Sequence, residues 1–415
     1  MESNALITND AIVLGLLAAT LGVIFYTTSS SHPAWRKFYK YVPAILLCYF
    51  IPSLYNALGL VDAERSRLYF VASRFLLPAT LALLTLSIDL GAIIRLGPKA
   101  LIMFITGTMG ILLGGPLTVL LFSFISPETV GGHGPDAVWR GLTTLAGTWI
   151  GGGANQTAMK EIFSVSDDVF SAMVAVDVLV ANVWLAVLLY MAGESEIIDA
   201  RLGADTSALE DLKRRVSEFQ EKTARIASLT DYMLIVGVGF GVTGLAHLVG
   251  DGLAPWIERT APHLERFSLT SSFFWIVVVA TTAGLLLSFT RVRDLEGAGA
   301  SKVGSLMLYF LVATIGMGMD ITAVVERPGI FAVGAVWMAF HAALLLIVGR
   351  VIKAPTFYLA VGSQANVGGA ASAPVVASAF HPSLAPVGVL LAVLGYALGT
   401  YGAWVCGQLM RVVAP

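Results

Sequence analysis

The chain is built from apolar segments long enough to cross a lipid bilayer, separated by short polar stretches. We count twelve, at about 10–27, 41–60, 69–90, 99–125, 138–163, 169–192, 230–250, 270–289, 303–321, 329–350, 355–380 and 384–410. A helix of roughly 20 apolar residues covers the hydrocarbon core. Only 13% of the 415 residues are charged, against about a quarter in soluble domains. The sequence therefore predicts an all-α polytopic membrane protein rather than a soluble enzyme.

Composition narrows the partners to the lipid bilayer and a small molecule. The formal net charge is −2, and no basic patch interleaved with aromatic residues suggests nucleic-acid binding. Cys48 and Cys406 both lie in apolar segments, where lone thiols act as small hydrophobic residues. The start of the chain lacks the basic residues of a signal peptide, so we expect segment 10–27 to be a retained span.

Two of the apolar segments are interrupted by glycine-rich sequence. Segment 138–163 contains Gly-Thr-Trp-Ile-Gly-Gly-Gly-Ala-Asn-Gln-Thr (147–157), and segment 355–380 contains Val-Gly-Ser-Gln-Ala-Asn-Val-Gly-Gly (361–369). An opened backbone survives at membrane depth only where it is buried in protein or lines a cavity. Interrupted segments at corresponding places in two halves are the best sequence indication of a transporter's binding site.

The distribution of basic residues favours hairpins that enter and leave the membrane on one side. With both interrupted segments drawn as re-entrant hairpins and the N-terminus outside, cytoplasmic loops carry 16 Lys and Arg and external loops carry 6. If segment 138–163 crossed instead, the basic cluster at 201–225 would lie outside, against the positive-inside rule. The hairpin arrangement leaves five crossings in each half, and an odd number inverts the second half.

These features predict two inverted repeats, each with five transmembrane helices and a re-entrant Gly-rich hairpin. We expect the N-terminal repeat at 1–192 with hairpin 138–163, and the C-terminal repeat at 229–415 with hairpin 355–380. The linker at 193–228 reads as cytoplasmic, with an amphipathic helix from Ser207. It either packs on the membrane domain or binds a partner.

The hairpin tips are the predicted substrate site. Glycines permit the tight turn, side-chain amides and hydroxyls supply hydrogen bonds, and half-helix ends at the tips suit a carboxylate or Na⁺. The candidates are Gly152, Gly153, Asn155, Gln156, Thr157, Ser363, Gln364, Asn366, Gly368 and Gly369. The alternative is that the glycines serve close helix packing.

A mid-helix acid, Asp177, is the predicted coupling-ion ligand, because a charge there requires a cavity and a partner. Asn155, Asn366 and Asn182 are further candidates, although Asn182 need not share a helix face with Asp177. The alternative is a structural acid bonded to a buried amide. No cofactor beyond Na⁺ or H⁺ is predicted, and Na⁺ would bind at the hairpin tips.

Lys160 follows the first tip and is a candidate to neutralise an anionic substrate, with Glu161 as its partner. Alternatively, both side chains extend toward the outer membrane surface. His341 lies within segment 329–350, where a lone histidine is more often a bonded structural residue than a proton relay.

The two glycine-rich runs, 147–155 and 362–369, resemble the YjcL-like family of uncharacterised bacterial and plastid membrane proteins over nearly the whole chain. The plan is more distantly similar to sodium/glutamate symporters and 2-hydroxycarboxylate transporters. That similarity implies a homodimer with an elevator motion, in which 151–157 and 363–369 hold substrate and Na⁺. A bacterial inner membrane location follows from the same likeness.

The sequence thus predicts a secondary active transporter of a small organic solute, an organic anion or amino-acid-like molecule, coupled to Na⁺ or H⁺. A passive channel with opposed half-helices is the first alternative. An intramembrane enzyme is the second, but the sequence lacks His-Glu-x-x-His, Gly-x-Gly-Asp and a Ser/His pair in matched spans. We therefore expect a protein that is not an enzyme.

Overall fold

The computed structural model describes residues 6–39, 42, 44–63, 65–88, 90–204, 226–267, 269–318, 328–381 and 384–415. These residues form helices, and the one extended pairing among them is an isolated bridge between Ile7 and Val61. Eight helical stretches within this described part of the chain are long and apolar enough to cross a membrane. The prediction of an all-α polytopic membrane protein is confirmed.

Eight of the ten predicted crossings have helices of spanning length. They are α1 (Asp10–Thr28), the α4–α5 stretch (Leu68–Leu86), α7 (Pro98–Ile125), α10 (Asp167–Gly193), α13 (Leu229–Thr260), α15 (Ala300–Gly318), α17 (Pro328–Val351) and α20 (Ala385–Val413). The α4–α5 stretch contains one π-helical turn, η1 (Ala72–Leu76), between α4 (Leu68–Val71) and α5 (Leu77–Leu86).

Segments 41–60 and 270–289 are shorter than predicted, for local reasons. Their helices are α3 (Ala44–Ala57) and α14 (Ser272–Leu287), with 14 and 16 residues. At about 1.5 Å per residue these helices are shorter than the roughly 30 Å core. Gly59 turns the chain after α3 with φ 68°. Beyond α14 the chain bends by 94° into the polar 3-10 helix η4 (Arg291–Ala298).

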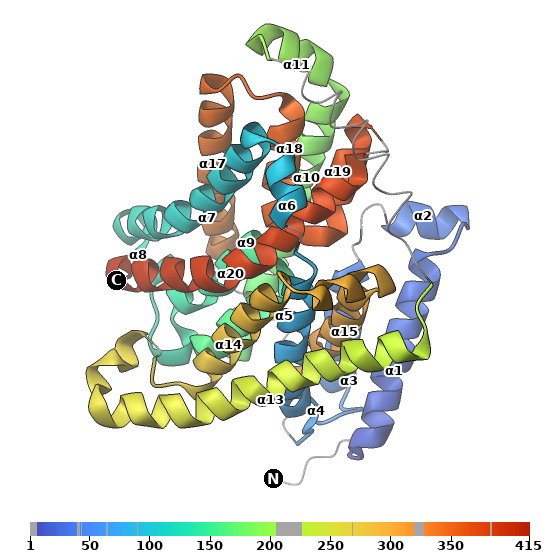
Figure 1. The fold of residues 1–415 in the computed structure, drawn as a ribbon. Coiled ribbons are helices and arrows are strands. Elements are labelled where there is room, and N and C mark those ends of the chain that lie inside the picture. The colour runs from blue at the N-terminus through green and yellow to red at the C-terminus, as the bar shows by residue number, and fades with distance from the viewer. Residues whose placement is uncertain are drawn as a thin grey trace.

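The helices pack as two groups, which Figure 1 shows as a lower and an upper part of the molecule. The framework group comprises α1, α3, α4, α5, α13, α14 and α15. The hairpin group comprises α7, α9 (Val138–Ile162), α10, α17, α18 (Thr356–Val367), α19 (Gly369–Phe380) and α20. Each group takes three consecutive apolar segments from each half of the chain, so the order of segments is the same in both halves.

Helix α9 consists of two arms that fold back on one another. The backbone leaves the helical region at Gly151 and at Gly152, where φ is 73°. A Cβ at Gly147 would lie 2.6 Å from the carbonyl oxygen of Asn155, so the arms are in backbone contact beside the break. At the far ends of the arms, the Arg140 guanidinium donates to the carbonyl of Phe163. Both ends of the segment therefore lie together, as in a hairpin.

The second interrupted segment has the same form. Helices α18 and α19 meet at Gly368 and Gly369, where Gly369 has φ 57°. The rings of Phe357 and Phe380, near the opposite ends of the two helices, are 5.4 Å apart. Since 12 residues of helix extend about 18 Å, ring contact at this distance requires the arms to run back alongside each other.

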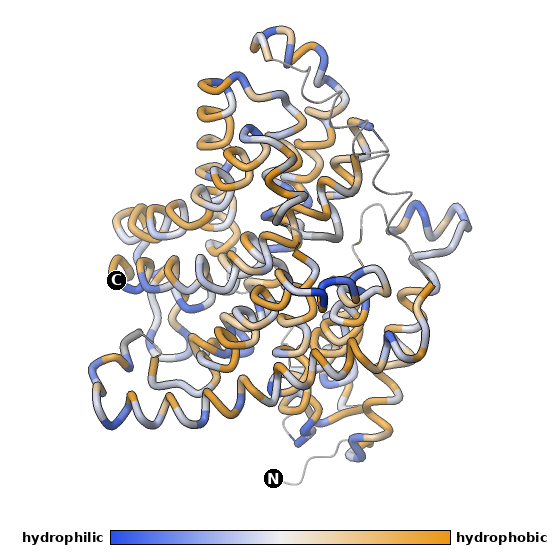
Figure 2. The backbone as a smooth tube through the Cα atoms, viewed as in Figure 1, coloured by the Kyte–Doolittle hydropathy of each residue, from blue (hydrophilic) through white to orange (hydrophobic). Residues whose placement is uncertain are grey.

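Many large apolar side chains on the long helices are exposed, and Figure 2 shows that apolar residues recur along most of the tube. Phe124 of α7, Val183 of α10 and Leu248 of α13 are all at least 60% exposed. Such contiguous apolar exposure fits a protein whose solvent is lipid, where outward-facing apolar residues carry no hydrophobic cost.

The connection between the halves is described only at its two ends. Helix α11 (Ser195–Leu202) follows α10, and its Asp199 carboxylate accepts hydrogen bonds from the Thr356 backbone N–H and hydroxyl at 2.7 and 2.6 Å. Asp199 thereby caps the start of α18. The amphipathic helix predicted from Ser207 lies outside the described residues.

The first hairpin break packs on α20 through glycine, which gives a test of the fold. A Cβ at Gly399 would lie 2.5 Å from the Cα of Gly151. We expect Gly399→Ala to lower the free energy of unfolding by about 1–3 kcal/mol, as overpacking does. Thermal melting of the purified protein in detergent measures it. Gly22→Ala in α1 is the control, since nothing lies within 4 Å of that position. Equal melting temperatures for both variants would contradict the close approach.

Candidate functional site

A cavity of about 410 Å³ lies between the two helix groups, at the breaks of both hairpins. Gly152 and Gly153 line it from the first break, and Gly368 and Gly369 from the second. The framework group contributes wall residues from α3 and α15. The cavity therefore combines the two places where the sequence opens its helices.

The predicted site residues divide into those that line the cavity and those buried around it. The lining residues are Gly152, Gly153, Gln156, Gln364, Gly368, Gly369, Asp177 and Asn182. The others, Asn155, Thr157, Ser363, Asn366 and Lys160, are buried but do not line it. Only some residues of each glycine-rich motif therefore line the cavity.

Asp177 of α10 joins its helix to the first arm of hairpin α9. Its carboxylate accepts from the Trp149 indole N–H at 2.7 Å and from the Thr148 hydroxyl at 3.2 Å. The half-buried carboxylate also faces the cavity. Both donors are neutral, so they orient the acid without balancing its charge. A bound cation or proton would balance it.

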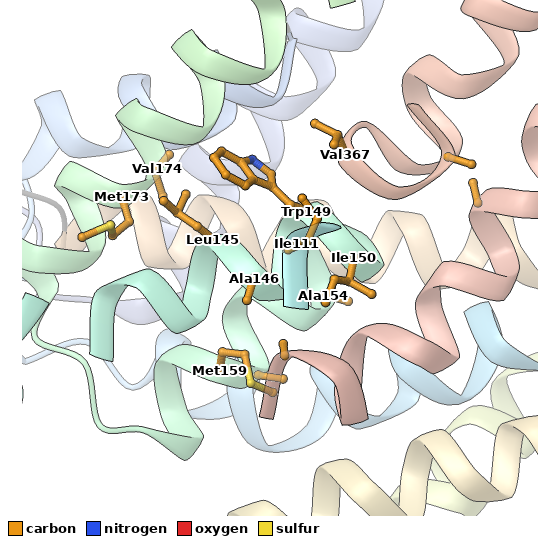
Figure 3. Packing of buried hydrophobic residues seen from close by; sticks show 14 of the residues in the cluster. Ile111, Leu145, Ala146, Trp149, Ile150, Ala154, Met159, Met173, Val174 and Val367 are labelled. Atoms are coloured by element: carbon orange, nitrogen blue, oxygen red, sulfur yellow. The ribbon is translucent and has the colours of Figure 1, made fainter. Parts of the chain in front are cut away.

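The packing around Trp149 fixes this arrangement. Figure 3 shows Trp149 and Ile150 on the first arm of α9, with Met173 and Val174 on the neighbouring α10. Trp149 is fully buried and makes an edge contact with the ring of Trp337, whose centroid is 5.2 Å away. The indole that holds Asp177 is therefore held in turn by the core of the hairpin group.

Asn182 faces the same cavity as Asp177 although the two are five residues apart. Its side-chain amide donates to the backbone carbonyl of Val178 at 2.6 Å, within α10. The cavity is wide enough along α10 to reach both residues, which helical spacing alone did not indicate.

Gln156 and Gln364 each present one unoccupied end of a buried amide. Both residues are 2% exposed and both line the cavity. The Tyr49 hydroxyl donates to Gln156 Oε1 at 3.4 Å, and Gln364 Nε2 donates to the Ser372 hydroxyl at 2.6 Å. Gln156 Nε2 and Gln364 Oε1 have no hydrogen-bond partner among the described residues. A buried polar atom without a partner is costly, so such atoms indicate a place for a ligand or water.

Asn155 is fully bonded and ties the first hairpin to α20. Its amide nitrogen donates to the carbonyls of Gly151 and Tyr396, both at 2.9 Å, and its oxygen accepts from the Thr400 hydroxyl at 2.6 Å. Both amide protons are used, the oxygen has a donor, and the fully buried side chain does not line the cavity, so it is not placed to bind a solute.

Asn366 repeats this pattern between the second hairpin and α7. Its nitrogen donates to the carbonyls of Phe104 and Gly362, at 3.0 and 2.9 Å, and its oxygen accepts from the Thr108 hydroxyl at 2.8 Å. In both cases the neighbouring helix, α20 or α7, supplies two groups to the asparagine. They are a threonine hydroxyl and the backbone carbonyl four residues before that threonine. Asn155 follows its break and Asn366 precedes its break, so the two asparagines are on opposite arms.

Ser363 belongs to a buried chain of hydrogen bonds. It lies 2.8 Å from His341 Nε2 and accepts from the Trp184 indole N–H at 2.8 Å, while His341 Nδ1 is 2.9 Å from the carbonyl of Gly107. The sequence did not reveal this Ser/His pair. Ser363 and His341 are both 0% exposed and away from the cavity wall, so a substrate has no room beside them.

Lys160 has an acidic partner, and it is not Glu161. Its ammonium lies 2.7 Å from the Asp167 carboxylate and 3.2 Å from the Tyr69 hydroxyl. Glu161 instead pairs with Arg74 of the π-helical turn at 3.2 Å. The predicted Lys160–Glu161 pair is wrong because the two side chains point to different neighbours at the hairpin base.

Thr157 is also occupied locally, since its hydroxyl donates to the carbonyl of Gly153 at 3.1 Å. The sequence missed several polar wall residues, among them Tyr49, Thr148, Ser305, Ser372 and Tyr396. Thr148 and Ser372 each lie within one turn of a break, which is a usable signal. Tyr49 carries no such signal because α3 meets the hairpin only in the tertiary structure.

The described residues contain no group of three or more His, Cys, Asp or Glu side chains placed to hold a metal ion. Na⁺ is bound mainly by carbonyl and hydroxyl oxygens in transporters. The Na⁺ site at the hairpin tips therefore remains a prediction.

Fold and cavity together define an integral membrane protein with two helical hairpins whose breaks line a common cavity. The chain belongs to a family described as "Protein of unknown function (DUF819)", whose model matches residues 15–413. It is 22% identical over 364 residues to the "Uncharacterized membrane protein YjcL" of Bacillus subtilis (strain 168), covering 84% of this chain and 85% of that protein. The resemblance to a YjcL-like family is confirmed.

The hydrogen bonds separate structural amides from those available to a ligand, and stability measurements test the distinction. We expect Asn155→Ala to lower the free energy of unfolding by about 1–3 kcal/mol, because it leaves buried partners unbonded. Gln156→Ala removes more atoms but should lower the free energy of unfolding by less, since the Gln156 amide nitrogen has no partner among the described residues. Thermal melting of both variants gives the comparison. A larger loss for Gln156→Ala would show that the roles are reversed.

Proposed function

We propose that the protein is a secondary active transporter of a small organic solute, coupled to Na⁺ or H⁺. The observation that carries the proposal is the cavity between the two helix groups, lined by both hairpin breaks and by Asp177. A bilayer-embedded protein tolerates opened backbone only where it is buried in protein or lines a cavity, and here both breaks line the same cavity. Paired breaks of this kind are typical of transporters that bind solute near the membrane midplane.

In this proposal the halves are inverted repeats and both hairpins are re-entrant. Support comes from the identical order of segments in the two halves, since each contributes its first three to the framework group and its last three to the hairpin group. The short second helix recurs in both halves as α3 and α14. The basic-residue distribution supports an external N-terminus. The similarity to a bacterial membrane protein supports a plasma-membrane location in a bacterium.

Transport proceeds in this proposal by movement of the hairpin group against the framework group, as in an elevator. The cavity wall belongs to both groups, so relative movement would open and close it. Polar contacts between the groups include Tyr49 to Gln156, Thr281 to Thr400 and Arg74 to Glu161. A second copy of the chain would hold the framework group in place, as the family resemblance implies for a homodimer.

Asp177 is the proposed ligand of the coupling cation. A carboxylate facing the cavity with only neutral donors around it binds Na⁺ or H⁺ favourably, and the bound cation removes an unbalanced charge from the membrane interior. Coupling then requires the solute to bind better to the cation-loaded cavity than to the empty one.

Gradient-driven uptake into liposomes tests this assignment. With labelled amino acids, monocarboxylates and dicarboxylates offered separately, we expect one class to accumulate under an inward Na⁺ or H⁺ gradient. Asp177→Asn should abolish accumulation, because the amide cannot bind either cation with the same charge compensation. Ser123→Ala on α7 serves as the folded control, since its hydroxyl bonds only to Val119 and Val413 carbonyls. Uptake insensitive to both gradients would exclude coupling and leave a passive channel.

Cross-linking the two groups tests the proposed movement. Thr281 and Thr400 have hydroxyls 3.1 Å apart across the boundary, so Thr281→Cys with Thr400→Cys should form a disulfide and stop uptake until it is reduced. The matched control is Leu83→Cys with Gly304→Cys, within the framework group, where the Cβ positions are 3.2 Å apart. Both pairs need Cys48→Ala and Cys406→Ala. Full uptake by the oxidised boundary pair would contradict the movement.

A further inference from the structure

We propose that the transported solute is a small zwitterion of the amino-acid class with an apolar side chain. This inference rests on the proposed transport function and specifies its substrate. It is built from the charge of the cavity, the two unoccupied amide ends, the half-helix ends at the breaks and the apolar part of the wall.

The cavity wall offers no fixed positive charge to a solute. Among the described residues that line it, Asp177 is the single carboxylate and none is Lys, Arg or His. The nearby Lys160 is bound by Asp167 and lies outside the wall. With its coupling cation bound, Asp177 leaves the cavity without net charge. A dicarboxylate would find no countercharge there, whereas a zwitterion carries its own.

The hairpin breaks suit the carboxylate of such a solute. The second arm of α9 begins at Gly153 and α19 begins at Gly369, and both glycines line the cavity. The first N–H groups of a helix lack intrahelical partners and carry partial positive charge. Gln156 adds an independent donor there, because the residue lines the cavity and its buried amide nitrogen has no partner among the described residues.

Gln364 supplies a hydrogen-bond acceptor, where Gln156 supplies a donor. Its amide nitrogen is used by Ser372, and in that orientation its carbonyl oxygen is left without a partner among the described residues. An amide oxygen accepts hydrogen bonds and cannot donate them. An ammonium group is a donor with no acceptor capacity, so it fits Gln364 Oε1. One glutamine therefore takes the carboxylate and the other the ammonium.

The apolar part of the cavity wall favours a solute with an apolar side chain. Val174, Val178 and Leu185 of α10 face the cavity together with Leu308 of α15 and Val367 of α18. An apolar solute side chain gains roughly 0.8 kcal/mol for each CH₂ removed from water. A volume of about 410 Å³ is near the lower end of ligand pockets, which favours a small solute.

Thermal stabilisation of the full-length protein in detergent with Na⁺ present tests the class directly. The probes are L-leucine, 4-methylpentanoate, isoamylamine and L-malate, which separate the two charges of the zwitterion from each other and from a dicarboxylate. We expect L-leucine to stabilise the protein, the two single-charge analogues to need at least about tenfold higher concentration, and L-malate to have no effect.

Two variants assign the charges to the two glutamines. Gln364→Leu should weaken L-leucine binding about tenfold and leave 4-methylpentanoate binding unchanged, because it removes only the ammonium acceptor. Gln156→Leu should weaken L-leucine and 4-methylpentanoate binding and leave isoamylamine binding unchanged. Ser123→Ala, away from the cavity, should bind all probes as the natural protein does.

The outcomes separate this inference from the transport proposal. Stabilisation by L-malate and its gradient-driven accumulation, without a response to L-leucine, would overturn the substrate class and leave the transporter standing. Binding of L-leucine that neither glutamine variant changes would overturn the assigned contacts. Failure of every solute class to accumulate under either gradient would overturn both proposals.

Discussion

The structure depends on one constraint, that peptide groups inside a lipid environment must find partners within the protein. Continuous helices satisfy it along their length, but the chain opens two helices at Gly151–Gly152 and Gly368–Gly369. Both openings line one cavity among the surrounding helices. In a membrane protein, opened backbone of this kind is tolerated only where it is buried in protein or lines a cavity.

Residues of the same type serve opposite purposes around these openings. Asn155 and Asn366 use every hydrogen-bonding group to fasten a hairpin to a neighbouring span. Gln156 and Gln364, one or two positions away, line the cavity, and one end of each buried amide has no partner among the described residues. A rigid pair of tips with unsatisfied amides is a preorganised site, since the ordering cost is met when the protein folds.

Much of the fold was predictable from local pattern. Apolar run length located eight spanning helices, and glycine pairs located both breaks, because these properties depend on neighbouring residues. The lengths of α3 and α14 were not predicted, since Gly59 and the polar turn at η4 end the helices inside apolar sequence. The predicted partner of Lys160 was also wrong, because Asp167 comes close to Lys160 only after the hairpin folds.

By itself, the sequence determined the membrane environment, the positions of the helices and the two breaks, since hydrophobicity and glycine act locally. Only the tertiary structure decided which polar residues face the cavity. A helix presents neighbouring residues in different directions, so Asn155 and Gln156 point to different surroundings although they are adjacent in the chain. Which of them remains available to a ligand is set by Tyr49, Tyr396 and Thr400, from helices far away in sequence.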